Sequence, residues 1–175
     1  MRSRKLTHEE FYVNAYYDAF EDQQNETPIE VVIHHNFNLE VIWDNKQVTE
    51  FLVQIFDAVV HEYRHKRQGK KRCYNDYWTR ASDMDVDYLI DPDEIDAYAV
   101  SIAIELCRTL GKFRALRHLH RVTLLSRLKV NHCFVSPNLH AYVQHFPNTD
   151  RPVLKTLAKK VYIRLQKIDT DHIFQ

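Results

Sequence analysis

The chain has 175 residues and equal numbers of basic and acidic side chains, 24 of each, so its formal net charge is zero. This balance argues against a globally basic nucleic-acid binder and an acidic disordered protein, and 45% hydrophobic residues suffice for one ordinary core. Three scattered cysteines without a CxxC pair, and no long apolar run, predict a soluble cytoplasmic protein that does not enter a membrane.

The first quarter of the chain predicts a helix and then a hairpin. Thr7–Glu10 has the capping-box form of a helix start, and we expect that helix to run through Phe20 into the polar stretch that follows. Ile29–Ile33 and Asn38–Trp43 are rich in β-branched and aromatic residues, with Asn36 as a candidate turn. These two segments predict a short antiparallel sheet.

The strongest helical pattern follows. Apolar residues recur at helical spacing, at Val48, Phe51, Leu52, Ile55, Phe56, Val59 and Val60. This spacing predicts a helix with one buried face that continues through His65 and ends near Gly69.

The rest of the chain predicts further helices. Residues 70–90 show no clear period and indicate a long surface loop. Asp91 and Pro92 then have the form of an N-cap and first helical residue, and Gly111 is a plausible stop. Further helical patterns cover 113–128, 138–146 and 152–168. We therefore expect one α+β domain over residues 1–175, mostly helical with a small antiparallel sheet.

The first part of the predicted site is His61-Glu62-Tyr63-Arg64-His65, an HExxH motif. Residues four apart on a helix project from the same face, so the two imidazoles can ligate one zinc ion. Glu62 beside the first imidazole can accept a proton from the attacking water. A catalytic zinc site needs a third protein ligand, which has to come from elsewhere in the chain.

Glu94 is the candidate third ligand. On the helix that opens at Pro92, one narrow polar stripe contains Glu94, Tyr98, Ser101 and Glu105, while the remaining surface is largely apolar. A nearly all-apolar helix is usually buried, so its polar stripe should face solvent or a polar cavity such as a metal site. Glu94 could also simply favour the N-terminus of its helix electrostatically.

These motifs carry a family resemblance. HExxH followed about thirty residues later by Glu-Ala-Asn-x-Phe-Ala resembles the ImmA/IrrE-type zincin metallopeptidases, and phage-type metallopeptidases look similar too. Here the matching run is Glu94–Ala99, with Ile95, Asp96 and Tyr98 departing from the pattern. The resemblance covers roughly residues 48–107. It implies a zincin-like fold in which Glu94 completes the zinc site.

The motif and the resemblance together predict a zinc metallopeptidase that hydrolyses peptide bonds in a protein or peptide substrate. Glu62 is the expected general base on water activated by Zn²⁺. Tyr98, His118 and His120 are the candidates for a hydrogen bond to the oxyanion. Asp57, one turn before His61, could orient an imidazole. The sequence leaves the oligomeric state open.

Two other interpretations remain. The chain could be a non-catalytic metal-binding or structural protein on a zincin-like scaffold that uses its basic loop, Lys66–Arg72, to bind nucleic acid; a solvated loop is favoured over that role. Residues 83–94 also match much of an EF-hand calcium loop. However, Tyr88 stands where the turn needs Gly, and Pro92 interrupts the loop.

Overall fold

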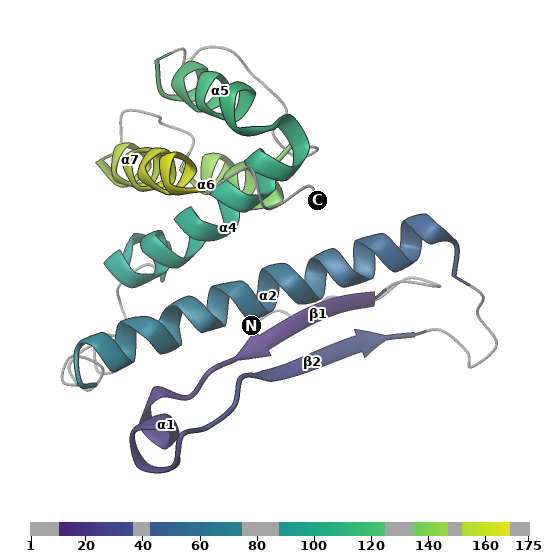
Figure 1. Ribbon diagram of the computed structural model, residues 1–175, viewed down its shortest axis with the longest axis vertical. Helices are drawn as coiled ribbons and strands as arrows, with labels where there is room; N and C mark the ends of the chain where they lie inside the picture. The colour runs from purple at the N-terminus through teal and green to yellow at the C-terminus, as the bar shows by residue number, and fades with distance from the viewer. Residues whose placement is uncertain (1–10, 37–42, 75–87, 125–134, 147–151, 169–175) are drawn as a thin grey trace. The chain divides into compact units, whose positions relative to one another are not determined.

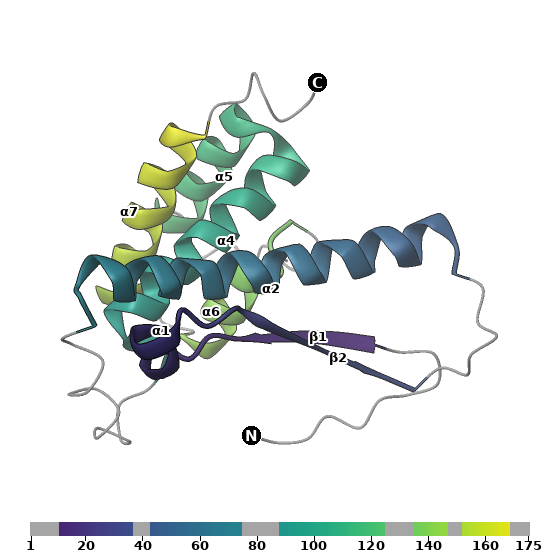
Figure 2. The ribbon, with the colours of Figure 1, turned by 60° about the horizontal axis from the view of Figure 1, so that its bottom comes forward.

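The computed structural model describes residues 11–36, 43–74, 88–124, 135–146 and 152–168 (Figures 1 and 2), without the side chains of 121–124. The chain divides into two compact units, residues 1–82 and 83–175. The described parts are mostly helical with one two-stranded antiparallel sheet, which confirms the α+β class. A single domain over the whole chain stays a prediction, because two compact units can belong to one folding domain or to two.

The sheet of the first unit pairs β1 (Phe11–Tyr16) with β2 (Glu30–His35), from Phe11 opposite His35 to Tyr16 opposite Glu30. The helix expected through Phe11 is therefore wrong. The reason is its pairing with β2, together with a contact in which Phe11 meets Phe51 at a ring-centroid distance of 5.4 Å. Packing of one strand face outweighed the apparent helical spacing.

The predicted strand at Ile29–Ile33 is confirmed as β2, but its observed partner is β1. Residues 38–42 of the other expected strand lie outside the described residues. Trp43 precedes the next helix, and its ring stacks on Phe11 at 5.4 Å between centroids.

A short helix, α1 (Ala19–Asn25), connects the two strands. The Asp18 side chain accepts hydrogen bonds from the backbone N–H groups of Phe20 and Glu21, at 2.8 and 3.0 Å. These bonds satisfy two of the donors that every helix leaves open at its start. Of the predicted helix, residues 11–16 form a strand and the part from Ala19 onwards is helical, while its expected start, Thr7–Glu10, lies outside the described residues.

The long helix α2 (Asn45–Lys71) confirms the predicted helix and extends slightly past Gly69. The expected burial of its whole apolar face is wrong, because Val48, Leu52 and Phe56 are exposed. It begins with a capping box, in which Asp44 accepts from the Gln47 backbone at 2.7 Å and the Gln47 side chain accepts from the Asp44 backbone at 3.0 Å. One face of α2 packs on β1 (Figure 1). Residues 66–71 of the basic run expected in a loop thus belong to this helix's last turns, and only Arg72 follows it.

In the second unit, a short 3₁₀ helix η1 (Tyr88–Ile90) precedes α4 (Pro92–Leu110), which packs against α5 (Lys112–Leu124), α6 (Pro137–His145) and α7 (Pro152–Lys167). These bounds confirm the helices predicted from Pro92 onwards. The fully buried side chains at the centre of this unit include Ile102, Leu106, Tyr142, Leu157 and Leu165. Of the loop expected over 70–90, residues 75–87 lie outside the described part.

The two predicted ends of α4 are both confirmed. The Asp91 side chain accepts from the Asp93 backbone N–H at 2.7 Å. Gly111 ends the helix with φ 73° and ψ 156°, and its N–H donates to the carbonyl of Cys107 at 2.8 Å. Among the described helices, none is both long and apolar enough to cross a membrane.

Candidate metal centre

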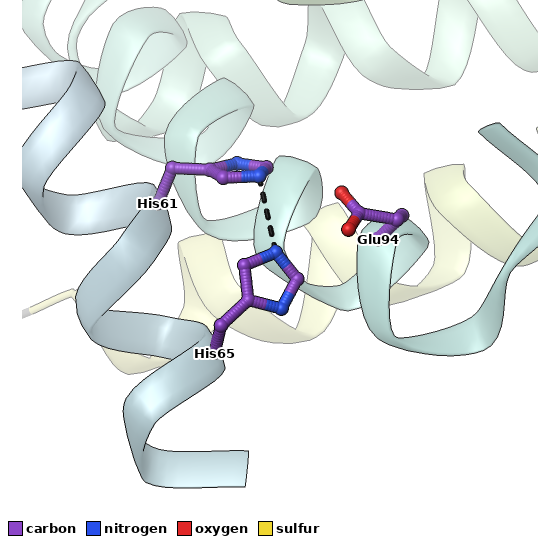
Figure 3. Close-up of side chains that lie close together, drawn as sticks. All are labelled: His61, His65 and Glu94. Carbon is purple, nitrogen blue, oxygen red and sulfur yellow. Dashed lines mark hydrogen bonds between the residues drawn. The ribbon is translucent and has the colours of Figure 1, made fainter. Parts of the chain in front are cut away.

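His61 and His65 lie one turn apart on α2 and project from the same side of the helix (Figure 3). Their Nε2 atoms are 3.2 Å apart, and the two rings meet edge to face with centroids separated by 4.8 Å. His65 is buried and His61 is half-buried. The two nitrogens therefore face one common point at the edge of the first unit's packed face.

This separation can be compared with the geometry of a zinc site. Two nitrogens at about 2.0–2.1 Å from a tetrahedral zinc ion, which subtend about 109°, lie about 3.3 Å from each other. The 3.2 Å between the Nε2 atoms fits that value. The same distance also suits a hydrogen bond between two neutral imidazoles, one donating and one accepting.

Two further predicted residues lie on the same helix. Glu62 directly follows His61 and is half-buried, so its carboxylate is shielded on one side and still open to water on the other. Asp57, also half-buried, is one turn before His61. The first unit therefore carries the two imidazoles, the expected general base and the expected orienting acid on consecutive turns of one helix.

Glu94 belongs to the second unit, in the first turn of α4, and its side chain is half-buried. Asp91 caps this helix, and Asp93 and Glu94 place two carboxylates beside its N-terminus, where the helix dipole favours negative charge. Two ring nitrogens and one carboxylate, from His61, His65 and Glu94, make a donor set that zinc accepts. Figure 3 draws these three side chains.

The expected polar stripe on α4 does not hold along its whole length. Ser101 and Glu105 are buried within the second unit. Glu105 accepts hydrogen bonds from the Ser136 hydroxyl and from Nδ2 of Asn138, the latter at 2.7 Å. This carboxylate therefore anchors the N-terminus of α6. Only Glu94 and Tyr98 of the stripe retain partial exposure.

Asp96 stands where the resembling family has Asn. It is buried, and the Arg164 guanidinium donates to its two oxygens at 3.0 and 3.3 Å, while Lys160 lies at 3.3 Å. Both cations come from α7. In this chain the position therefore fixes α4 to α7.

The three candidates for oxyanion stabilisation occupy different places in the second unit. Tyr98 lies one turn after Glu94, and its ring contacts Tyr142 edge to face at 5.2 Å. His118 and His120 lie on α5, which begins only after α4 ends. The 16 residue steps from Glu94 to Leu110 span about 24 Å of helix. Within this unit, Tyr98 is the candidate nearest in sequence and helix position to Glu94.

The chain matches no family model, no curated protein and no solved structure. The family resemblance thus rests on the sequence motifs alone and stays a prediction.

A buried ion pair that the sequence did not predict lies directly after His65. The Lys66 ammonium is 2.9 Å from the Asp22 carboxylate and also donates to the carbonyl of Thr27 at 2.6 Å. The hydroxyls of Tyr17 and Tyr74 donate to the other Asp22 oxygen at 2.9 and 2.6 Å. We call this group the Asp22 cluster; it joins α1 to the C-terminal turns of α2.

The protonation of the Asp22 cluster follows from these contacts. Burial alone would raise the pKa of Asp22, but hydrogen bonds from Tyr74, Lys66 and Tyr17 outweigh it and lower the pKa to about 2. Burial and the neighbouring carboxylate raise the pKa of Tyr17 well above its usual range, and the bond to Asp22 raises that of Tyr74. Asp22 is therefore charged and both tyrosines are neutral near neutral pH.

The basic residues that follow His65 differ in their contacts. Lys66 is engaged with Asp22, and Lys70 pairs with Glu26 at 2.9 Å on the surface. Arg67 and Lys71 are exposed. The calcium-loop interpretation depends on the acids at 83–87, which lie outside the described residues.

Proposed function

We propose that this protein is a zinc-dependent peptidase on a zincin-like scaffold, with His61 and His65 of α2 and Glu94 of α4 as the ligands. The observation that carries the proposal is the 3.2 Å separation of the two Nε2 atoms on consecutive turns of one helix. The chemistry of the donor set adds to it, because two imidazoles and one carboxylate leave a fourth position open for catalysis.

Zinc held there would supply a Lewis acid that activates water and polarises a peptide carbonyl. Glu62 accepts the proton of the attacking water and passes it to the leaving amine. Its place beside His61, half-buried, keeps the carboxylate close to the ligand pair while leaving a path for substrate. Asp57, one turn earlier, is placed to accept a hydrogen bond that orients the His61 ring.

Tyr98 is the side chain that we assign to the developing oxyanion. It follows Glu94 by one turn, so ligand and phenol project from the same side of α4. The edge-to-face contact with Tyr142 restrains its ring. A hydroxyl donor aimed at the oxyanion stabilises the transition state more than the substrate.

The first test measures zinc per chain by elemental analysis after dialysis against a zinc buffer. The wild type should hold one equivalent, and His61→Ala and Glu94→Ala should each lose it. Glu50→Gln, an exposed glutamate on the same helix, is the matched control and should hold zinc normally. Zinc retention by His61→Ala would overturn the site. Retention by Glu94→Ala alone would leave the histidine pair and remove Glu94 from the ligand set.

The second test separates binding from turnover, with a mixture of fluorescence-quenched peptides as the probe. Glu62→Gln should keep its zinc and lose cleavage by a factor of at least about 100, since a positioned general base contributes 10²–10⁴-fold. Tyr98→Phe should lower kcat more than it raises KM. If zinc binds stoichiometrically while no peptide is cleaved by any form, the non-catalytic metal-binding alternative replaces the peptidase.

A further inference from the structure

Basic residues are concentrated on two helices of a chain whose net charge is zero. α5 carries four Lys and Arg residues and α7 carries five, and neither helix contains an acidic residue. The two helices pack against each other in the second unit. Together they hold nine of the 24 basic residues of the chain, so this pair of helices carries a net positive charge.

At least three of these cations are engaged within the unit. Lys112 donates to the backbone carbonyls of Gln166 and Ile168, at 3.1 and 2.7 Å. Lys160 and Arg164 bind the buried carboxylate of Asp96. The remaining basic side chains that the structure describes on these helices are all exposed, and we call them the basic surface: Arg114, Arg117, Lys155, Lys159 and Lys167.

Aromatic side chains accompany the basic surface. The Phe113 side chain, which precedes Arg114, is 87% exposed, the highest value among the large hydrophobic residues that the structure describes. Tyr162 of α7 is 47% exposed, and its hydroxyl accepts a hydrogen bond from Gln166 at 2.9 Å. Ala115 and Leu119, on the opposite side of α5, are buried in the core. Phe113 is therefore an aromatic ring that the folding of this unit does not use.

We propose that the basic surface binds single-stranded nucleic acid. Arginine and lysine side chains would contact the phosphates, and Phe113 and Tyr162 would stack against unpaired bases. Such stacking is not open to a duplex, whose base faces are already covered by their neighbours. Charge complementarity supplies the affinity, because backbone phosphates are a regular row of negative charges.

A membrane surface fits these residues less well. An interfacial helix inserts a continuous apolar face below the lipid headgroups. In α5 that face is occupied, since Ala115 and Leu119 pack in the core and leave Phe113 as the exposed apolar residue in the first turn. One ring among arginines suits base stacking better than insertion.

The test follows the fluorescence anisotropy of a labelled oligothymidylate over a series of salt concentrations. The wild type should bind it, with an affinity that falls as salt rises. The double variant Arg114→Gln/Arg117→Gln should bind at least about tenfold more weakly, with a salt slope shallower by about 1.4, because each phosphate contact contributes about 0.7. Phe113→Ala should weaken binding about tenfold with the slope unchanged.

The matched control removes the same charge from α2. Arg67 and Lys71 are exposed members of the basic run after His65, so Arg67→Gln/Lys71→Gln should bind like the wild type. Glu62→Gln should also bind like the wild type, since Glu62 is not a member of the basic surface. Equal weakening by the α2 variant, tighter binding of duplex DNA, or binding of anionic vesicles without the oligonucleotide would overturn the proposal.

Discussion

Lys66 of α2 and Asp22 of α1 form an ion pair at 2.9 Å in which the Asp22 side chain is fully buried and the Lys66 side chain is only 16% exposed. The pair lies one residue after His65. It therefore restrains α2 directly after the turn that carries the proposed ligands, on the C-terminal side of that turn.

The Asp22 carboxylate should make the first unit sensitive to acid. Its pKa is lowered from 3.8 to about 2 on folding, so the stabilisation is complete above pH 3.8 and is lost as the pH falls through 2. We expect the wild-type free energy of unfolding, measured with urea at a series of pH values, to fall between about pH 4 and pH 2.

Asp22→Asn should be less stable at neutral pH and should show a flatter curve in this acidic window. Glu50→Gln, which alters an exposed carboxylate on α2, is the control and should keep the wild-type slope there. Parallel curves for the wild type and Asp22→Asn would contradict the assignment.

The two lysines of the α1–α2 contact should differ in their effects. Lys66→Met leaves a buried carboxylate without its cation and should destabilise the protein by about 3 kcal/mol. Lys70→Met removes a surface pair of the same type one turn later and should cause no measurable loss. Chemical denaturation compares the two variants.

If the Asp22 cluster positions the ligand turn, Lys66→Met should also weaken zinc binding under conditions where the variant is fully folded. A competition titration with a chelator measures this affinity, and Lys70→Met should be unchanged. Equal zinc affinity for both folded variants would show that the cluster stabilises the fold alone.

Asp96→Asn places the residue of the resembling family at this position. We expect it to lose about 2 kcal/mol of stability, since charge-assisted hydrogen bonds from Arg164 and Lys160 are weakened. Zinc content should not change. Thermal unfolding and elemental analysis of the same preparation check the two statements, and zinc loss from a folded Asp96→Asn variant would give Asp96 a role in the site.

Replacing Gly111 should lower the stability of the protein, and the cause should be the backbone conformation alone. A Cβ added there would meet no atom within 4 Å, but φ 73° with ψ 156° is a region that essentially only glycine adopts. Gly111→Ala should cost about 2 kcal/mol in urea unfolding with an unchanged m-value. Gly111→Asn should not rescue it, because asparagine tolerates the left-handed helical region and not this one.

The sequence predicted well where one pattern dominated. Two helices were predicted with nearly the observed bounds, one from the spacing of Val48 to Val60 and one from the Asp91–Pro92 start. Helical spacing and capping both depend on residues that are close together in the sequence. Phe11–Tyr16 was assigned to a helix because the pairing that makes it a strand depends on β2, nineteen residues further on. Long-range pairing of this kind leaves little local trace.

The candidate site was also predicted only in part. HExxH on a helix predicted that His61 and His65 would meet, and their 3.2 Å separation agrees. Glu105 was placed on an open polar stripe, although it caps α6 through Ser136. Helical spacing tells which residues share a face but not what covers that face. Asp22 gave no signal in the sequence, since a single acid in a polar stretch is ordinary.

The Asp22 cluster gathers partners 5 and 52 residues away, Tyr17 and Tyr74, around one carboxylate. Closing a chain loop of that length costs entropy that nearby contacts such as the α2 turns avoid. During synthesis the helix can therefore coil early, while its far end lacks the contact with Tyr74 until that residue has left the ribosome. A nascent chain stalled before Tyr74 should hold the turn of the two imidazoles through Lys66 and Asp22, and release should add the last contact.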